Sequence, residues 1–376
     1  MLAAEIEPFD RLACDIARHQ IAHVPAVARL AKARGLAAEA MHEAAQIPAV
    51  PTDVFRFARV AAHPAEDDVA TFRTSGTTSG ARGSHALRTL LTYNVGAMAW
   101  GARYLIDPRG ETPQRDATTD RPFEGARSTG VRADEEQRTP AVTAQRDDFT
   151  VISLTPPPEE ATDSSLVHMI SLFARSQRGP TSYHLVSGAL DPRGVERACE
   201  EARREGRATL LFGTSFAFVH LLDAANGLDL RLPAGSRAML TGGFKGRSRE
   251  VPAEELRASI IAAFAIADRA VVGEYGMTEL SSQLYEATLV EPGAPHGVFV
   301  APPWMRVVAV DPATLAPVPE GEIGIARIVD LANVDSAVAV QTADRVRVRG
   351  DHVELLGRLP GATPRGCSLA VEEILG

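Results

Sequence analysis

Cysteine, lysine and long apolar runs are all scarce in this chain of 376 residues. The three cysteines, Cys14, Cys199 and Cys367, lie far apart, which excludes a disulfide framework and a zinc knuckle. Only Lys32 and Lys245 are lysines, so arginine carries almost all of the positive charge. An anion site in this protein therefore has to rely mainly on arginine.

No apolar run is long enough to span a bilayer, and the first residues lack the basic region of a signal peptide. We therefore expect a cytoplasmic protein without a membrane span. A net charge of −9 argues against a nucleic-acid partner, because nucleic-acid binding surfaces are basic. The length and a hydrophobic content of 45% are typical of a large globular core with a smaller appended part.

The stretch from Thr71 to His85 is rich in threonine, serine and glycine and also carries Arg82. Its hydroxyls and flexible backbone predict a phosphate-binding loop, and we expect a helix over 87–105 to place the loop at a helix N-terminus. It matches neither the Gly-Lys-Ser/Thr loop nor the dinucleotide fingerprint, and a plain surface turn is the alternative. The candidate phosphate ligands are Thr74, Ser75, Gly76, Thr77 and Thr78.

From residue 150 onward, apolar strand patterns alternate with helical patterns. Strands are predicted at 151–154, 209–212, 237–240 and 270–272, with helices at 216–222 and 253–264 between them. This α/β alternation predicts a largely parallel sheet with helices on both faces. Ligands of such folds bind beyond the carboxyl ends of the strands, where Gly213, Gly242 with Gly243, and Gly276 are expected.

The composition of the sequence changes along the chain and predicts three divisions. Residues 1–296 are predicted to form the α/β core, with packing helices in the first 50 residues and a flexible surface insertion at about 107–148. Residues 297–358 contain short β-prone runs and predict a β-rich subdomain, in which Gly350 and Asp351 form a hairpin turn. Residues 359–376 form a tail that ends in a short helix.

A second chemistry-bearing stretch, Gly273 to Glu279, follows the apolar strand at 270–272. Tyr275 can stack on a base, Thr278 can bond a phosphate oxygen, and Glu279 offers a hard oxygen ligand for Mg²⁺. The alternative is an ordinary strand end followed by a helix cap.

Together, the loop at 71–85 and the Tyr-Gly-x-Thr-Glu sequence resemble the motifs of the adenylate-forming enzyme superfamily. This resemblance implies that Tyr275, Gly276 and the Gly242–Gly243 turn lie along the adenine of ATP, with Lys245 near a phosphate or carboxylate. It also implies that Asp344, in Thr-Ala-Asp where the superfamily has Thr-Gly-Asp, binds the ribose hydroxyls. Arg358 ends the following hairpin, and Asp351 is only a turn residue.

The stretch from Gly357 to Glu373, with Ser153-Leu154-Thr155, more narrowly resembles the acyl-protein synthetase family of bacterial luminescence. That family activates a fatty acid with ATP to acyl-AMP, transfers the acyl group to a cysteine near its C-terminus, and supplies a partner acyl reductase. The acceptor here would be Cys367, and we expect Arg365 to lower the pKa of its thiol. The alternative is that Cys367 is a small buried hydrophobe.

One departure separates this chain from two-domain adenylate-forming enzymes, which carry a catalytic lysine in a C-terminal lid. Eighteen residues follow Arg358 and none is lysine, so we expect the lid to be absent or vestigial. Arg82 and Lys245 are then the candidates for stabilising charge on the α-phosphate. Two other functions stay open: a ligase that passes its adenylate to an external thiol, and a nucleotide-binding protein without catalysis.

Overall fold

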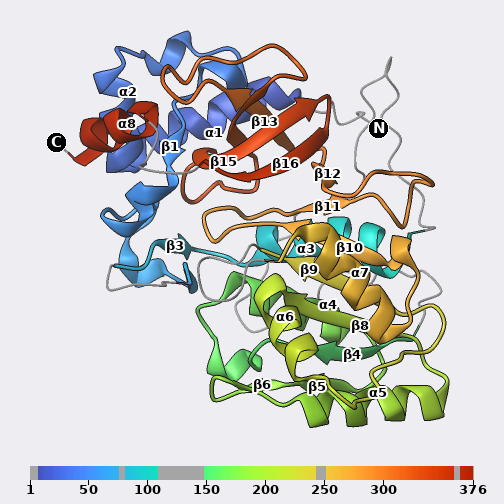
Figure 1. The fold of residues 1–376 in the computed structure, drawn as a ribbon. Helices are drawn as coiled ribbons and strands as arrows, with labels where there is room; N and C mark the ends of the chain where they lie inside the picture. Colours follow the sequence, from blue (N-terminus) through green and yellow to red (C-terminus); the bar gives the residue numbers. More distant parts are fainter. Residues whose placement is uncertain (1–6, 76–80, 109–147, 243–250, 360–364, 376) are drawn as a thin grey trace, which may run out of the picture.

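A single twelve-stranded sheet runs through the whole molecule in the computed structural model, which describes residues 7–75, 81–108, 148–242, 251–359 and 365–375 (Figure 1). The strand order is β13-β14-β15-β16-β12-β11-β10-β9-β8-β4-β5, with β1 paired to β15. One half of the sheet is parallel and the other antiparallel, and the two halves join at β10 and β11.

The parallel half confirms the predicted alternation of strands and helices. Its strands are β4 (Thr150–Ser153), β5 (Thr181–Tyr183), β8 (Thr209–Thr214), β9 (Arg237–Thr241) and β10 (Val271–Tyr275). Its helices are α4 (Ser165–Ser176), α5 (Pro192–Glu205), α6 (Ser215–Ala224) and α7 (Ala253–Phe264). A small hairpin, β6 (Leu185–Val186) with β7 (Ala189–Leu190), precedes α5.

Both faces of these strands are buried, because successive side chains point to opposite faces of the sheet. Val151 and Phe212 pack with residues of α4 on one face. Ile152 and Leu211 pack with residues of α5, α6 and α7 on the other. Hydrophobic side chains therefore occupy both sides, as expected of a parallel sheet covered by helices.

The antiparallel half contains the segment 297–358, which the sequence predicts to be β-rich, and also β11, which the sequence division places in the α/β core. Its strands are β11 (Leu284–Glu286), β12 (Val298–Val300), β13 (Met305–Val310), β14 (Ile323–Asp330), β15 (Ala339–Arg349) and β16 (His352–Arg358). The long strand β15 has an irregularity of register at Asp344 to Val346, where it pairs with β16. Gly350, with φ of +59°, and Asp351 form the predicted hairpin turn.

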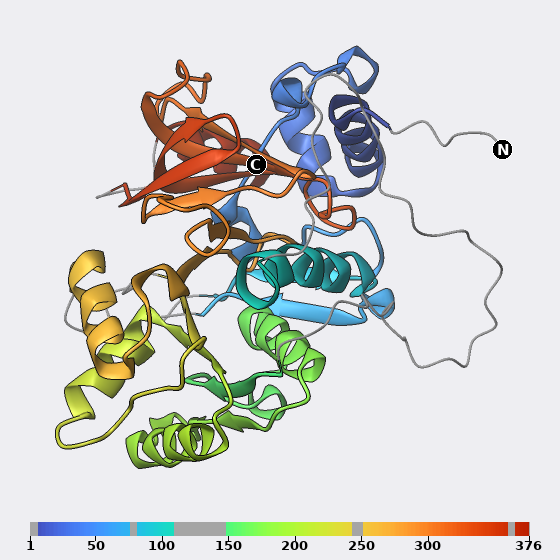
Figure 2. The same ribbon diagram turned by 90° about the vertical axis from the view of Figure 1, so that its right-hand side faces the viewer.

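Residues 7–60 pack against the antiparallel half, although the sequence division places them with the α/β core. They form α1 (Phe9–His23), α2 (Pro25–Ala33) and β1 (Val50–Pro51), and α8 (Arg365–Leu375) lies on α2 and β1. Figure 2 shows the blue N-terminal helices beside the orange and red strands. The buried side chain of Gln20 donates to the Asn333 carbonyl at 2.7 Å and accepts from the Val338 amide at 2.8 Å.

Strands β2 (Ala70–Arg73) and β3 (Ser84–Leu87), which flank the predicted phosphate loop in the sequence, pair as an antiparallel hairpin. α3 (Leu91–Gly101) begins later and continues into a π-helical turn at Ala102–Ile106. The expected helix over 87–105 is therefore confirmed from Leu91 onward, whereas its predicted start and the placement of the loop at its N-terminus are wrong. Pairing of Ser84–Leu87 with β2, a tertiary contact, separates the loop from the helix.

Most of the predicted insertion, residues 109–147, lies outside the described residues. No helix in the described ranges is long and apolar enough to cross a membrane.

Candidate active site

The carboxyl ends of β8, β9 and β10 lie side by side. In the sheet register, Thr214 is opposite Thr241, and Thr241 is opposite Glu274. Gly242, with φ of +69°, leaves β9 at this edge, and its carbonyl accepts a hydrogen bond from Ser215 Oγ at 2.6 Å. Two of the predicted glycine-marked loops thus begin at one edge of the sheet, as parallel strands require.

Tyr275 and Asp344 meet where the two halves of the sheet join. The phenol of Tyr275 donates to Asp344 Oδ2 at 2.8 Å, and both residues are half-buried. Asp344 on β15 is the register partner of Arg358 on β16. Burial and the Asp344 carboxylate raise the pKa of Tyr275, so its hydroxyl stays a donor. Asp351 lies in the turn at the other end of this hairpin, away from Tyr275.

Glu274 is a buried carboxyl beside Gly276 that the sequence reasoning did not single out. The Thr241 hydroxyl donates to Glu274 Oε2. Burial raises the pKa of Glu274 to about 7. A Cβ on Gly276 would lie 2.4 Å from Glu274 Oε1, so only glycine fits there without displacement. Glu274 therefore links the end of β9 to the start of the Tyr-Gly-x-Thr-Glu segment.

We expect Gly276→Ala to lower the free energy of unfolding by about 1–3 kcal/mol, because the added methyl has to displace the buried Glu274 carboxyl. Urea denaturation measures the effect. Gly96→Ala is the matched control, since its Cβ would make only an ordinary contact with Trp304 at 3.6 Å. An equal loss from Gly276→Ala in a Glu274→Ala background would show that Glu274 is not the cause.

The neck of the phosphate hairpin is closed by Thr74 and Gly83. The Thr74 amide donates to the Gly83 carbonyl at 3.0 Å, and the Gly83 amide donates to Thr74 Oγ1 at 2.9 Å. The Thr74 hydroxyl accepts here and keeps its own proton for a further acceptor. Ser75 is exposed. The candidates Gly76, Thr77 and Thr78 lie outside the described residues.

Arg82 binds within the protein in this structure. Its Nη1 donates to Asp163 Oδ2 at 2.7 Å, its Nε to the Thr74 carbonyl at 2.6 Å, and its Nη2 to the Arg73 carbonyl at 3.2 Å. These bonds hold the hairpin against the segment that precedes α4. The charge-stabilising role predicted for Arg82 stays a prediction. Gly243 and Lys245 lie outside the described residues.

Glu279 is the predicted metal ligand, and it is buried at 7% exposure. The backbone carbonyl of Glu279 accepts a hydrogen bond from the side-chain amide of Asn333 at 2.9 Å. Within the described residues, no three histidine, cysteine, aspartate or glutamate side chains gather as a metal site. Mg²⁺ in nucleotide sites takes one or two carboxylates and completes its shell with phosphates and water. A single carboxylate beside nucleotide phosphates fits that donor set.

Cys367 on α8 is buried at 4% exposure against Val310 and Ile325. Burial, with the nearby Asp53 carboxylate, raises the pKa of its thiol to about 11. The expectation of a lowered pKa is therefore wrong for this conformation, because the cost of ionising a thiol inside the apolar cluster exceeds the effect of nearby arginine. At pH 7 the thiol is protonated.

Leu359 connects the surroundings of Cys367 with the ribose-binding candidate. It packs against the cluster that contains Cys367, and its amide donates to the Ala343 carbonyl at 2.9 Å. Ala343 directly precedes Asp344.

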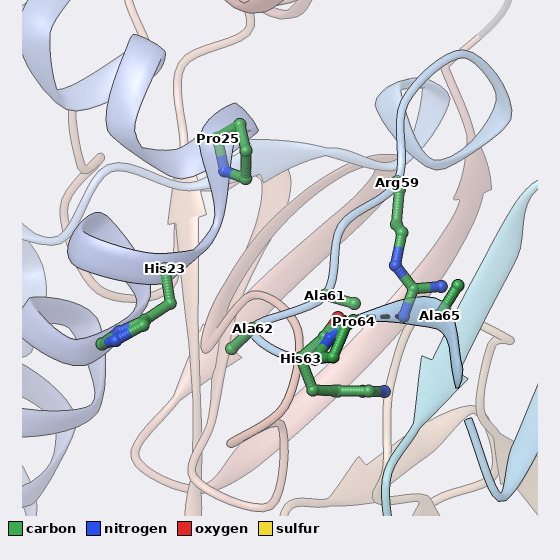
Figure 3. A pocket seen from close by; sticks show the side chains of 8 residues that line it. All are labelled: His23, Pro25, Arg59, Ala61, Ala62, His63, Pro64 and Ala65. Carbon is green, nitrogen blue, oxygen red and sulfur yellow. Dashed lines mark hydrogen bonds between the residues drawn. The ribbon is translucent and has the colours of Figure 1, made fainter. Parts of the chain in front are cut away.

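A cavity of about 450 Å³ lies away from these residues (Figure 3). Figure 3 shows Arg59 above His63, whose carbonyl accepts from Arg59 at 3.1 Å. The cavity contains none of the predicted site residues and is lined by His23, Pro25, Arg59, Ala61, Ala62, His63, Pro64 and Ala65.

Comparison with solved structures identifies the fold of the protein. The chain superimposes on 2-hydroxyisobutyryl-CoA ligase in an open conformation, in complex with 2-HIB-AMP and CoA, with a TM-score of 0.61 and 12% identity over 92% of this chain and 73% of that one. The same ligase in its thioesterification state gives a TM-score of 0.60 and 15% identity over 92% and 66%. The protein has the α/β fold of adenylate-forming ligases.

One known protein is similar to this chain in sequence. The long-chain-fatty-acid–luciferin-component ligase of Vibrio harveyi is 23% identical over 206 residues, which are 52% of either chain. The chain therefore spans about half the length of that relative. No family model matches the sequence. The resemblances to adenylate-forming enzymes and to the acyl-protein synthetase are confirmed, at low identity.

Proposed function

We propose that this protein is an ATP-dependent ligase that activates a carboxylic acid, of the fatty-acid class, as acyl-AMP and transfers the acyl group to the thiol of Cys367. The observation that carries the proposal is the 2.8 Å hydrogen bond between Tyr275 and Asp344 in a fold shared with adenylate-forming ligases. Residues from two motifs 69 positions apart meet where the two halves of the sheet join. The relative from Vibrio harveyi is a long-chain-fatty-acid–luciferin-component ligase, which supports the choice of a fatty acid as substrate.

In the first step, an oxygen of the substrate carboxylate attacks the α-phosphorus of ATP and pyrophosphate leaves. The Asp344 carboxylate accepts from the ribose hydroxyls, and the ring of Tyr275 lies against adenine. Thr74 offers its remaining hydroxyl proton to a phosphate, and Arg82 supplies positive charge at the hairpin. Mg²⁺, when bound beside Glu279, neutralises phosphate charge.

In the second step, the thiolate of Cys367 attacks the acyl carbonyl carbon and AMP leaves. The thiol has to lose its proton to solvent, which burial opposes. Transfer therefore requires α8 to move away from Val310 and Ile325. The product, a thioester on the protein, has the chemistry of a substrate for an acyl reductase, which is the partner that we propose.

The test is ATP-dependent incorporation of radiolabelled fatty acid into the purified protein. We expect label that hydroxylamine removes, and at least a tenfold loss of label in Cys367→Ser with acid-dependent pyrophosphate exchange retained. Cys14→Ser and Cys199→Ser are matched controls, because both thiols are also buried. Equal labelling of Cys367→Ser and the controls would contradict the acceptor role.

The burial of Cys367 also favours a second candidate, a ligase that passes its adenylate to an external thiol. Exchange without protein-bound label is the result expected of that ligase. Absence of both exchange and label across a range of acids would leave a nucleotide-binding protein without catalysis.

A further inference from the structure

His85 on β3 is fully buried and joins three segments of the chain. Its Nδ1 lies 2.7 Å from the Thr278 carbonyl oxygen, and its Nε2 lies 2.9 Å from Ser336 Oγ. The sequence places these partners 193 and 251 positions away. No local pattern predicts either contact.

The hydrogen bonds fix the tautomer of His85. A carbonyl oxygen can only accept, so Nδ1 carries the proton and donates to Thr278. Nε2 then accepts from the Ser336 hydroxyl. Burial lowers the pKa of His85 to about 4, so the ring is neutral at pH 7. Both ring nitrogens are satisfied in one arrangement only.

The bond to Thr278 connects two parts of the candidate site. His85 directly follows Ser84, the first residue of β3, whose register partner on β2 is Arg73. It therefore lies next to the neck of the phosphate hairpin. Thr278 and Glu279 are the candidate phosphate and metal ligands. The Arg82–Asp163 pair fixes the hairpin to the segment before α4, and His85 fixes it to the Tyr-Gly-x-Thr-Glu segment.

We infer that His85 is a positioning residue, which holds the phosphate hairpin and the Thr278–Glu279 segment in register through its Nδ1–H bond to the Thr278 carbonyl. This inference rests on the proposed function, since it assigns the two segments to one nucleotide. A purely packing role, such as the edge contact with Phe55 at 6.1 Å between ring centroids, would not depend on which ring nitrogen donates.

Two substitutions separate these roles. The amide nitrogen of Asn can occupy the position of Nδ1, whereas the amide of Gln reaches the position of Nε2. Both remove the aromatic ring. We expect His85→Gln to raise the Kd for MgATP about tenfold, and His85→Asn to stay within threefold of the unchanged protein. Calorimetric titration measures Kd, and thermal unfolding follows the stability of each variant.

Equal Kd values for His85→Asn and His85→Gln would overturn the inference, and so would failure of the unchanged protein to bind MgATP. A loss of folded protein lowers the number of binding sites without changing Kd, which keeps stability and positioning apart. If neither variant folds, Ser336→Ala replaces them: it removes the donor that fixes the tautomer, and we expect a Kd about threefold higher. An unchanged Kd in Ser336→Ala would then overturn the inference.

The outcome for the proposed function is read separately. MgATP binding without acid-dependent pyrophosphate exchange in the unchanged protein would overturn the proposed function, while the Kd values would still decide the role of His85. Exchange together with equal Kd values for the two variants would leave the function standing and overturn the positioning role.

Discussion

Asp344→Ala is expected to lower kcat/KM for ATP about 100-fold in acid-dependent pyrophosphate exchange. The carboxylate accepts hydrogen bonds from two ribose hydroxyls in the proposed complex. Each hydrogen bond to a charged group contributes about 1.5–3 kcal/mol to binding. The substitution also leaves the phenol of Tyr275 without its acceptor at 2.8 Å. Because Tyr275 is the proposed adenine platform, both contacts to the nucleoside weaken together.

Asp351→Ala is the matched control for Asp344. Asp351 lies on the same hairpin but in its turn, seven positions further along the chain, and its carboxylate bonds to the adjacent His352 ring at 2.9 Å. We expect kcat/KM for ATP to change less than twofold. Equal losses from Asp344→Ala and Asp351→Ala would contradict the ribose assignment.

Glu274→Gln should change how stability depends on pH. The folded-state pKa of Glu274 is about 7, against an ordinary value of 4.5, so between these values the folded protein holds a proton that the unfolded chain releases. This contribution to stability is fully present below pH 4.5 and is lost as pH rises through 7. The free energy of unfolding of Glu274→Gln relative to the unchanged protein should therefore rise by about 3 kcal/mol from pH 4.5 to 8.

The difference in the free energy of unfolding between Glu274→Gln and the unchanged protein reports on Glu274 and not on other titrating groups. Burial lowers the pKa of His85 and His168 to about 4, so their contribution is lost as pH falls from 6.5 to 4, the opposite direction. These terms are common to both proteins and cancel. Glu255→Gln, at an exposed position of α7, is the control and should show no such pH-dependent gain. A constant difference between Glu274→Gln and the unchanged protein at all pH values would contradict the buried-carboxyl interpretation.

Features encoded by local patterns could be predicted from the sequence. The boundaries of α7 follow from helical periodicity, and Gly350 with Asp351 marks the turn, because a tight hairpin requires residues that tolerate positive φ. The Thr-Ala-Asp resemblance predicts Asp344 as a ribose ligand, which stays a prediction, and the structure places its carboxylate 2.8 Å from the Tyr275 hydroxyl.

Features created by tertiary packing could not be predicted. The strand Ser84–Leu87 pairs with β2 across the loop, so the expected helix start moved to Leu91. The environment of Cys367 depends on Val310 and Ile325, which are more than 40 positions away, and no neighbouring residue signals their burial. His85 and Glu274 lie inside the two stretches that the sequence singled out, but only their distant partners indicate a role.

The packing of α1 on the antiparallel half also has a consequence for synthesis on the ribosome. The buried amide of Gln20 bonds to the carbonyl of Asn333, which is 313 positions later in the chain. At typical elongation rates of about 5–20 residues per second, roughly 15–60 s separate the synthesis of the two. During that interval α1 and α2 expose the apolar face that β14 and β15 later cover. A chaperone that covers this face during the interval would therefore protect the nascent chain from association.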